Sequence, residues 1–344
     1  MTIIKSSFAF ILVSLLCLSP LHGQRENNVW IMPNQNGLDF NFDPPRVIES
    51  NSLRGETIGA ISNADGALLF YCDGVNIYNR NHDVLPNGSA VATATSSNNG
   101  VIFIPDATDP DLIHLYIVNS IGGTQGRRLS YNRIDKSLDG GLGDVLSGYR
   151  SVTIGEEYAE GMKAVKGSCG FVWIVLRKVN SKELHAIKVL NGEIVDIVIS
   201  DILVSDKFLS SPSPPWTVGE LDYSTASGLL IVGFADRALE LFSFDTETGI
   251  VSDPLVLSAG DESPDLRRVT TTAYESVVFT PDGRSVITAI WPTGEEKSIV
   301  KFDFNYETKT TSRSIIASYS PSGPTEISRH PIRGDIWLTR GNSS

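Results

Sequence analysis

The residue types that most often carry catalysis are scattered along this sequence. Four histidines follow residue 23, and none stands in a His-x-His or His-x-x-x-His spacing that would favour a zinc site: His82, His114, His185 and His330. The sequence also lacks the Gly-x-Ser-x-Gly pattern of a serine nucleophile and the Cys-x-x-Cys, phosphate-loop and dinucleotide-binding glycine patterns. We therefore assign no catalytic and no metal-ligating residue, and we expect each histidine to make a structural hydrogen bond.

One acidic loop carries oxygen ligands of the kind that bind calcium. Asp106, Asp109 and Asp111 crowd a short segment. However, Ile117 stands where the helix-loop-helix calcium pattern requires a bidentate Glu. The other interpretation is a polar turn whose Asp side chains accept hydrogen bonds from their own backbone, and we favour it. We thus predict no cofactor, with calcium at this loop as the alternative.

A third set of side chains could bind a ligand together if the fold gathered them. Charged and aromatic residues stand next to the beginnings of several predicted strands: Glu56, Glu157, Glu160, Trp216, Arg268, Tyr274 and Glu326. Trp216, which follows two prolines, could stack on a sugar or a peptide, and the alternative is a tryptophan that caps the core. The elements that position these residues decide whether they form a site.

A turn followed by an apolar run recurs along the chain. Its markers lie 45 to 59 residues apart, which is the length of one four-stranded propeller blade: Gly66, Asp111, Gly170, Gly228, Gly283 and Gly334. Later strands of each unit, such as Leu184–Val189 and Leu239–Asp245, alternate apolar and polar residues. The pattern predicts an all-β fold, a β-propeller of WD40-like repeats with six blades, or seven as the alternative. The candidate binding residues would then line the mouth of its central channel.

The two ends of the chain each supply strands without a complete blade. Asn28–Met32 and Arg46–Glu49 precede the first unit, and the sixth unit begins near Pro324 and has only two strands before Ser344. An exposed strand edge invites aggregation, so a closed ring is favoured. We predict that the N-terminal strands pair with the C-terminal ones and complete the last blade.

The N-terminus has the features of a secretory signal peptide. Lys5 precedes an apolar stretch from Phe8 to Leu18, and Gly23 offers a small-residue cleavage site. We therefore expect residues 1–23 to be removed, residues 24–344 to form one domain, and the product to be secreted or held at the cell surface. No later segment is apolar enough to insert into a membrane.

Charge and cysteine content limit the partners and the covalent links. The net charge of −12 disfavours nucleic acid and anionic lipid as partners. Cys72 and Cys169 remain after residue 23 and fall in different predicted blades, so a disulfide between them is left open. The number of subunits is not determined by the sequence.

Several motifs carry a family resemblance that covers most of residues 29–340. They are Leu38-Asp39-Phe40-Asn41 with Pro44-Pro45, the run from Ala60 to Tyr71, Leu138-Asp139-Gly140-Gly141, and Phe279-Thr280-Pro281-Asp282-Gly283. In these the chain resembles the N-terminal β-propeller-like region of exported Bacteroidetes surface proteins of the gliding-motility and type IX secretion type. Adhesion and sorting domains usually follow in that family, so the chain is a short member, a truncated product or the first part of a longer protein. Cys72 stands where that family more often has Thr.

Two functions follow from these expectations. The resemblance implies no catalytic residues, and we therefore expect a non-enzymatic recognition module of the cell envelope that binds an extracellular protein or glycan at one face of the ring. The alternative is a propeller hydrolase or lyase with a polar or metal site in the channel. The run Phe242-Ser243-Phe244-Asp245 with Thr248-Gly249 is similar to blades of propellers that hydrolyse sugar lactones.

Overall fold

The structure is a computed structural model that describes most of the chain as β-strands. The described residues are 25–52, 57–94, 97–119, 127–179, 181–202, 220–233, 239–258, 273–291, 297–319, 325–331 and 333–340. Apart from two short 3-10 helices, η1 (Asp139–Gly141) and η2 (Ser147–Tyr149), the regular elements in these ranges are all strands. No helix in this part of the chain has the length and apolar character needed to cross a membrane.

Within the described residues the strands form seven antiparallel sheets that follow one another along the chain. Sheet A contains β1 (Val29–Met32), β2 (Asn36–Asp39) and β3 (Arg46–Glu49), and sheet B contains β4 (Gly59–Ser62), β5 (Leu68–Cys72) and β6 (Ile77–Asn79). Sheet C contains β7 (Val101–Pro105), β8 (Leu112–Val118), β9 (Leu129–Asp135), β10 (Asp144–Val145) and β11 (Val152–Gly155). Sheet D contains β12 (Tyr158–Lys166), β13 (Val172–Lys178), β14 (Glu183–Leu190) and β15 (Glu193–Asp201).

The remaining sheets come from the C-terminal part of the chain. Sheet E contains β16 (Leu221–Ser224), β17 (Leu229–Gly233), β18 (Leu239–Phe244) and β19 (Val251–Ser258). Sheet F contains β20 (Ala273–Phe279), β21 (Ser285–Trp291), β22 (Lys297–Asn305) and β23 (Thr310–Tyr319), and sheet G contains β24 (Thr325–Arg329) and β25 (Ile336–Arg340). In sheets D, E and F each strand pairs with the next, as the predicted repeat requires.

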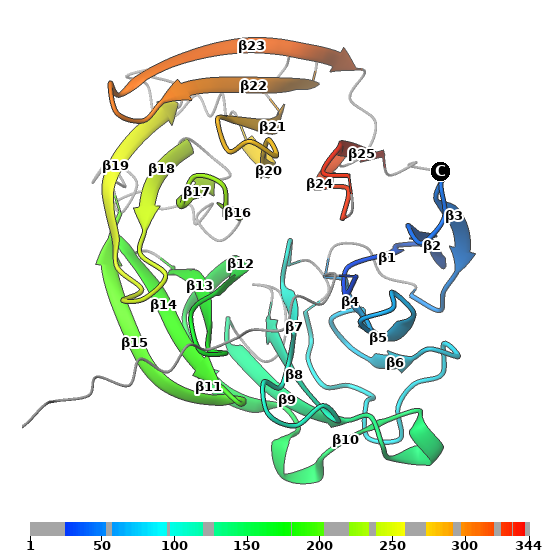
Figure 1. Cartoon of the computed structure of the whole chain (residues 1–344). Helices are drawn as coiled ribbons and strands as arrows, with labels where there is room; N and C mark the ends of the chain where they lie inside the picture. The colour runs from blue at the N-terminus through cyan, green and yellow to red at the C-terminus, as the bar shows by residue number, and fades with distance from the viewer. Residues whose placement is uncertain are drawn as a thin grey trace, which may run out of the picture.

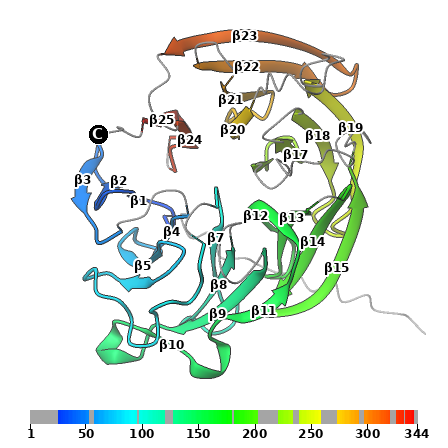
Figure 2. The ribbon, with the colours of Figure 1, turned by 180° about the vertical axis from the view of Figure 1, so that it is seen from behind.

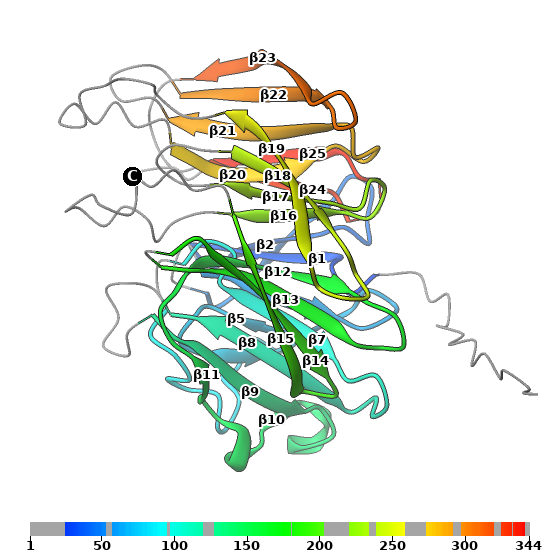
Figure 3. The ribbon, with the colours of Figure 1, turned by 90° about the vertical axis from the view of Figure 1, so that its left-hand side faces the viewer.

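The sheets stand around a common centre, as Figure 1 and the opposite view in Figure 2 show. The first strands of sheets B to G lie innermost, and each contacts the first strand of the next sheet. The side view shows the strands running across the molecule, with sheet F at the top and sheet C at the bottom (Figure 3). This radial arrangement is that of a β-propeller, the class that the repeat predicts.

Apolar side chains from neighbouring sheets hold this arrangement together. One cluster joins sheets D and E through residues such as Trp173, Val175, Val232 and Phe242. Equivalent clusters join sheet C to sheet D and sheet E to sheet F. Strand β17 is buried along its whole length, which explains its unbroken apolar sequence. Sheets D and E therefore each bury apolar side chains of both faces against their two neighbours.

The outer side of sheet B is covered by an excursion from sheet C. After β9 the chain passes through η1, β10 and η2 before it returns as β11. Within this excursion the Asp144 carboxylate accepts hydrogen bonds from the Asn87 backbone and side chain, at 2.8 and 2.6 Å. The Arg150 side chain donates to the carbonyl oxygens of Asn87 and Ser89. Cys72, in the β5 strand beneath, is a buried free thiol and is therefore not bonded to Cys169.

The two ends of the chain meet, but not in the predicted way. Strands β1, β2 and β3 pair with one another, and in the described chain β24 pairs with β25 alone. The expected backbone pairing between the ends is thus replaced by side-chain contact between sheets A and G. Phe40 packs against Trp30, His330 and Trp337, with ring centroids 4.4, 4.6 and 5.3 Å away. Pairing N-terminal with C-terminal strands requires closing a loop of about 300 residues, which costs conformational entropy. Each strand can pair with its neighbour in the sequence without this cost, so local pairing is favoured.

A conservative change at Phe40 tests this junction. Phe40→Leu keeps an apolar side chain but removes three aromatic contacts, and we expect the free energy of unfolding to fall by about 1–2 kcal/mol. The matched control is Phe42→Leu, because Phe42 is 49% exposed whereas Phe40 is 2% exposed. Urea unfolding would measure both variants. Equal stability of the two variants would show that the aromatic cluster does not join the ends.

Candidate functional site

The ring has one end at which most predicted binding residues fall. We call it the entry end, the end at which the innermost strands β4, β7, β12, β16, β20 and β24 begin. Glu157 immediately precedes β12 and is exposed, while Glu160 lies within β12 and is buried. Tyr274 and Glu326 are the second residues of β20 and β24. The structure thus places these four positions near the beginnings of three inner strands, those of sheets D, F and G.

The other predicted binding residues lie outside the described residues. These are Glu56, Trp216 and Arg268. For Tyr274 and Glu326 the structure gives the strand position alone. Glu157 is therefore the one candidate whose exposure at the entry end is established. Its backbone adopts a left-handed conformation, with φ of 62°, and its carbonyl accepts a hydrogen bond from the Val179 amide at the end of β13.

Near the axis, three charged side chains from three sheets meet. Asp222 on β16 accepts contacts from Lys163 on β12 and from Arg329 on β24, each at 2.7 Å. The Asp222 carboxylate also accepts a hydrogen bond from the Phe279 amide on β20, at 2.9 Å. We call Lys163, Asp222 and Arg329 the central hub. A single buried carboxylate thus links the innermost strands of sheets D, E, F and G.

Other polar side chains tie neighbouring inner strands in the same manner. Glu220, which precedes β16, accepts a hydrogen bond from the Val277 amide on β20 at 3.0 Å. Ser276 on β20 accepts a hydrogen bond from the Ile327 amide on β24 and donates to the Ile327 carbonyl. Backbone amides on the inner edges lack a neighbouring strand, and these side chains satisfy them. The side chains of Asp222, Glu220 and Ser276 therefore hold neighbouring inner strands together.

A buried acid and a buried base face each other between sheets D and E. Glu240 on β18 and Arg177 on β13 belong to the same two sheet faces as the apolar cluster between these sheets. Burial raises the pKa of Glu240 to about 8, and the attraction of Arg177 only partly offsets it. Burial also lowers the pKa of Arg177 to about 10. One oxygen of the Glu240 carboxyl, Oε2, is buried without a hydrogen-bond partner.

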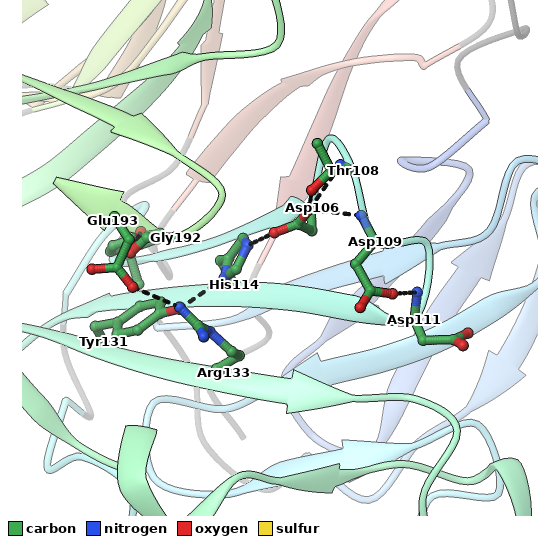
Figure 4. A network of polar contacts seen from close by, with 10 residues as sticks. Asp106, Thr108, Asp109, Asp111, His114, Tyr131, Arg133, Gly192 and Glu193 are labelled. Atoms are coloured by element: carbon green, nitrogen blue, oxygen red, sulfur yellow. Dashed lines mark hydrogen bonds and ion pairs between the residues drawn. The ribbon is translucent and has the colours of Figure 1, made fainter. Parts of the chain in front are cut away.

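A chain of polar contacts links sheets C and D away from the axis (Figure 4). Arg133 donates through Nε to the Tyr131 hydroxyl at 2.8 Å, and that hydroxyl lies 2.8 Å from His114 Nδ1. His114 Nε2 in turn lies 2.9 Å from the Asp106 carboxylate. Arg133 also pairs with Glu193 of β15, at 3.0 Å.

The hydrogen-bond donors in this series of contacts determine which nitrogen of His114 carries the proton. Because Arg133 donates to Tyr131, the tyrosine hydroxyl donates to His114 Nδ1, and the proton on Nε2 is donated to Asp106. Burial lowers the pKa of His114 and outweighs the effect of Asp106, which favours this neutral form. Burial alone would raise the pKa of Asp106, but hydrogen bonds from Asp109, Thr108 and His114 lower it to about 2. Every polar atom of the imidazole is occupied, so this histidine has a structural role.

The remaining histidines also make hydrogen bonds, as predicted. His185 lies between the Tyr158 hydroxyl, at 3.2 Å, and the Glu183 carboxylate, at 3.1 Å, which repeats the order of groups around His114. His82 contacts the Tyr71 hydroxyl, and His330 accepts a hydrogen bond from the Arg333 amide. The prediction that each of these four histidines makes a hydrogen bond is confirmed.

The acidic loop of residues 106–111 forms the predicted turn. Asp106 accepts hydrogen bonds from the Thr108 and Asp109 amides, both at 2.8 Å. Asp109 accepts one from the Asp111 amide at 3.0 Å. Within the described ranges no three His, Cys, Asp or Glu side chains come close enough to hold a metal ion. Calcium binding stays a prediction that these contacts do not test.

Sequence reasoning missed the central hub and the Arg177–Glu240 pair. A charged residue in the middle of a short inner strand, such as Asp222 in Leu-Asp-Tyr-Ser, was the available signal. The partners Lys163 and Arg329 lie 59 and 107 positions away, so no motif could connect them. Glu240 likewise stands in an otherwise apolar strand and pairs with a residue of another sheet.

Among known proteins, this chain has only distant similarity to solved structures. No family model matches the chain, and no curated protein matches it. The β-propeller domain of Cps50 (Swd1) from Myceliophteria thermophila is 11% identical, covers 92% of this chain and 94% of its own, and has a TM-score of 0.46. A putative 6-phosphogluconolactonase from Bacteroides fragilis is 11% identical, with coverage of 84% and 80% and a TM-score of 0.47. The periplasmic gluconolactonase of Pseudomonas aeruginosa is 12% identical, with coverage of 84% and 94% and a TM-score of 0.34.

Proposed function

We propose that the chain is a non-enzymatic recognition module that binds a protein or a glycan at the entry end of the ring. The main support for this proposal is that the polar groups described near the axis already bond to neighbouring sheets. The central hub and the Glu220 and Ser276 contacts link sheets to one another, so these groups are occupied by structural bonds. The protein or glycan is therefore bound by exposed side chains at the rim of the entry end, of which Glu157 is the described example.

We propose further that the seven sheets are the seven blades of a closed ring. Sheet G has two strands and sheet A has three, and they meet through Phe40 and through an ion pair between Arg333 and Asp43 at 3.3 Å. This count favours the seven-bladed alternative over the six blades that the repeat spacing alone suggests. A closed ring gives the entry end a fixed shape on which rim residues of several blades act together.

The place of action in this proposal is the outside of the cell. The signal-peptide features of residues 1–23 and the resemblance to exported Bacteroidetes surface proteins support a secreted or surface-held module. The acidic net charge supports an extracellular protein or a neutral or basic glycan as the partner rather than nucleic acid.

The alternative function is a hydrolase or lyase of the lactonase type. One observation favours it: the Glu240 carboxyl has its pKa raised to about 8, and a general acid must hold a proton near neutral pH. Against it, the carboxyl is buried among apolar side chains between two sheets and would need an opening to reach a substrate.

A charge reversal at the rim tests the proposed binding face. The labelled chain is applied to a glycan array and to immobilised surface proteins of a Bacteroidetes cell envelope, where we expect saturable binding. Glu157→Lys should weaken that binding at least tenfold, because Glu157 is exposed at the entry end. The matched control is Glu307→Lys, since Glu307 is exposed in the turn between β22 and β23 at the opposite end. Equal binding by both variants would contradict the proposal, and turnover of glucono-δ-lactone would favour the enzyme instead.

A further inference from the structure

The outer edge of sheet D is a second surface with the character of a binding site. Strand β15 is nine residues long, lies outermost in its sheet and, in the described chain, pairs with β14 alone. Figure 1 shows it running along the outside of the ring. An outermost strand of this length presents a row of backbone donors and acceptors to which another strand can pair.

Three of the exposed side chains of β15 are aliphatic and lie close together in the strand. Val195, Ile197 and Ile199 are 53%, 45% and 55% exposed. Ile197 and Ile199 are alternate residues and lie on one face, whereas Val195 stands at a bulge between Ile194 and Asp196. The three side chains together form an apolar stripe beside the open edge. The sequence of β15 contains no Lys, Arg or Pro, the residues that commonly protect an edge from pairing.

The outer surfaces of sheets B and F do not combine these features. The outer side of sheet B is covered by the η1–β10–η2 excursion. In β23 the exposed residues Ile315 and Ile316 are consecutive rather than alternate, and the strand contains Arg313, a residue of the kind that protects an edge. The open edge with an aliphatic stripe is therefore a property of sheet D among these surfaces.

The charges on β15 indicate what the added strand must carry. Glu193, Asp196 and Asp201 are the charged residues of the strand, and all are acidic. The Asp196 carboxylate accepts a hydrogen bond from the neighbouring Ile197 amide at 2.8 Å, which a basic side chain of an incoming strand could replace with an ion pair. Antiparallel pairing of two β15 strands about Ile197 would instead set Glu193 opposite Asp201, and opposed like charges are unfavourable.

We propose that the β15 edge binds an extended segment of a partner protein as an added strand. The segment has aliphatic or β-branched residues at alternate positions, which cover the stripe of Val195, Ile197 and Ile199, and Lys or Arg near its ends. This surface lies on the outer wall of the ring and is separate from the entry end. Its partner and the ligand of the entry end can therefore bind at the same time.

The test uses the full chain and a fluorescein-labelled peptide, acetyl-Lys-Thr-Val-Thr-Val-Thr-Val-Thr-Lys-amide, followed by fluorescence anisotropy. We expect saturable binding, protection of the β15 amides from hydrogen exchange, and at least tenfold weaker binding by Ile197→Lys. The matched control Ile315→Lys, in β23, should bind as the parent does, because Ile315 is 61% exposed on another outer strand. A peptide with Glu in place of both Lys residues should bind at least tenfold more weakly. Unchanged melting temperatures show that both variants are folded.

Three results would overturn the proposal. The first is no saturable binding of the Lys-ended peptide up to millimolar concentration. The second is equal affinity of Ile197→Lys and Ile315→Lys for that peptide. The third is a dimer of the parent, seen by sedimentation, that Ile197→Lys dissociates, since this would assign the edge to a second copy of the chain. The Glu157→Lys variant should bind the peptide normally, so failure at the entry end and failure at this edge are distinguishable.

Discussion

Replacing Asp222 with alanine is expected to lower the free energy of unfolding by about 3 kcal/mol. The change leaves the buried Phe279 amide without its acceptor, which costs about 1–3 kcal/mol. It also removes the carboxylate from two cations, Lys163 and Arg329, which are about one-third exposed, so each contact contributes about 0.5–1 kcal/mol. Urea unfolding of the full chain measures the loss.

Two further variants separate the parts of this effect. Asp222→Asn retains an acceptor for the Phe279 amide and loses the charge, so we expect it to recover part of the stability. Asp303→Ala is the matched control. Asp303 also forms a short ion pair, at 2.6 Å with Lys301, but its side chain is 48% exposed. We expect it to lose less than about 1 kcal/mol. If Asp222→Ala were no worse than this control, the central hub would not hold the four sheets together.

The stability of the folded chain is expected to fall between pH 4.5 and pH 8 because of Glu240. Below the ordinary pKa of 4.5 the carboxyl is protonated in both the folded and the unfolded chain, whereas burial raises the folded pKa to about 8. Between these values the folded chain keeps a proton that the unfolded chain has lost, so the free energy of unfolding falls as the pH rises. The total loss is on the order of 5 kcal/mol. Above about pH 8 this contribution levels off.

The Glu240→Gln variant isolates this contribution. Its amide resembles the protonated carboxyl and does not titrate, so the stability difference between variant and parent should be small at pH 5 and should favour the variant increasingly toward pH 8. His114, whose pKa is lowered, changes stability in the opposite direction, but it is present in both chains and cancels in the difference. The control Glu307→Gln, at an exposed turn position, should keep the slope of the parent. Parallel pH profiles for parent and Glu240→Gln would show that the buried carboxyl is ionised when folded.

The hairpin units were predictable from the sequence because their signals are local. The turn glycines that mark the repeat, for example Gly66 and Gly283, have φ of 91° and 66°, a conformation that glycine adopts without strain. The strands that follow them begin within a few residues of the predicted positions. The turn at Asp106 was predictable for the same reason, since an Asp side chain reaches the amides two and three positions later.

The joining of the ends was not predictable in detail. The sequence favoured pairing of N-terminal with C-terminal strands, because both sets lacked a complete blade. In the structure each set keeps its own hairpins, and the contact is made by Phe40, Trp30, His330 and Trp337. Aromatic packing between two sheets leaves no periodic signal in either segment.

The all-β class, the repeating hairpins, the turn residues and the dispersal of the histidines could all be predicted from the amino-acid sequence. Each of these depends on interactions between residues close in the chain, which alternation and turn chemistry record directly. The tertiary structure decided the separation of sheets A and G, the central hub and the meeting of Arg177 with Glu240. Those features join residues of different sheets, and the contacts exist only where packing brings the strands together and burial changes the energy of a charge.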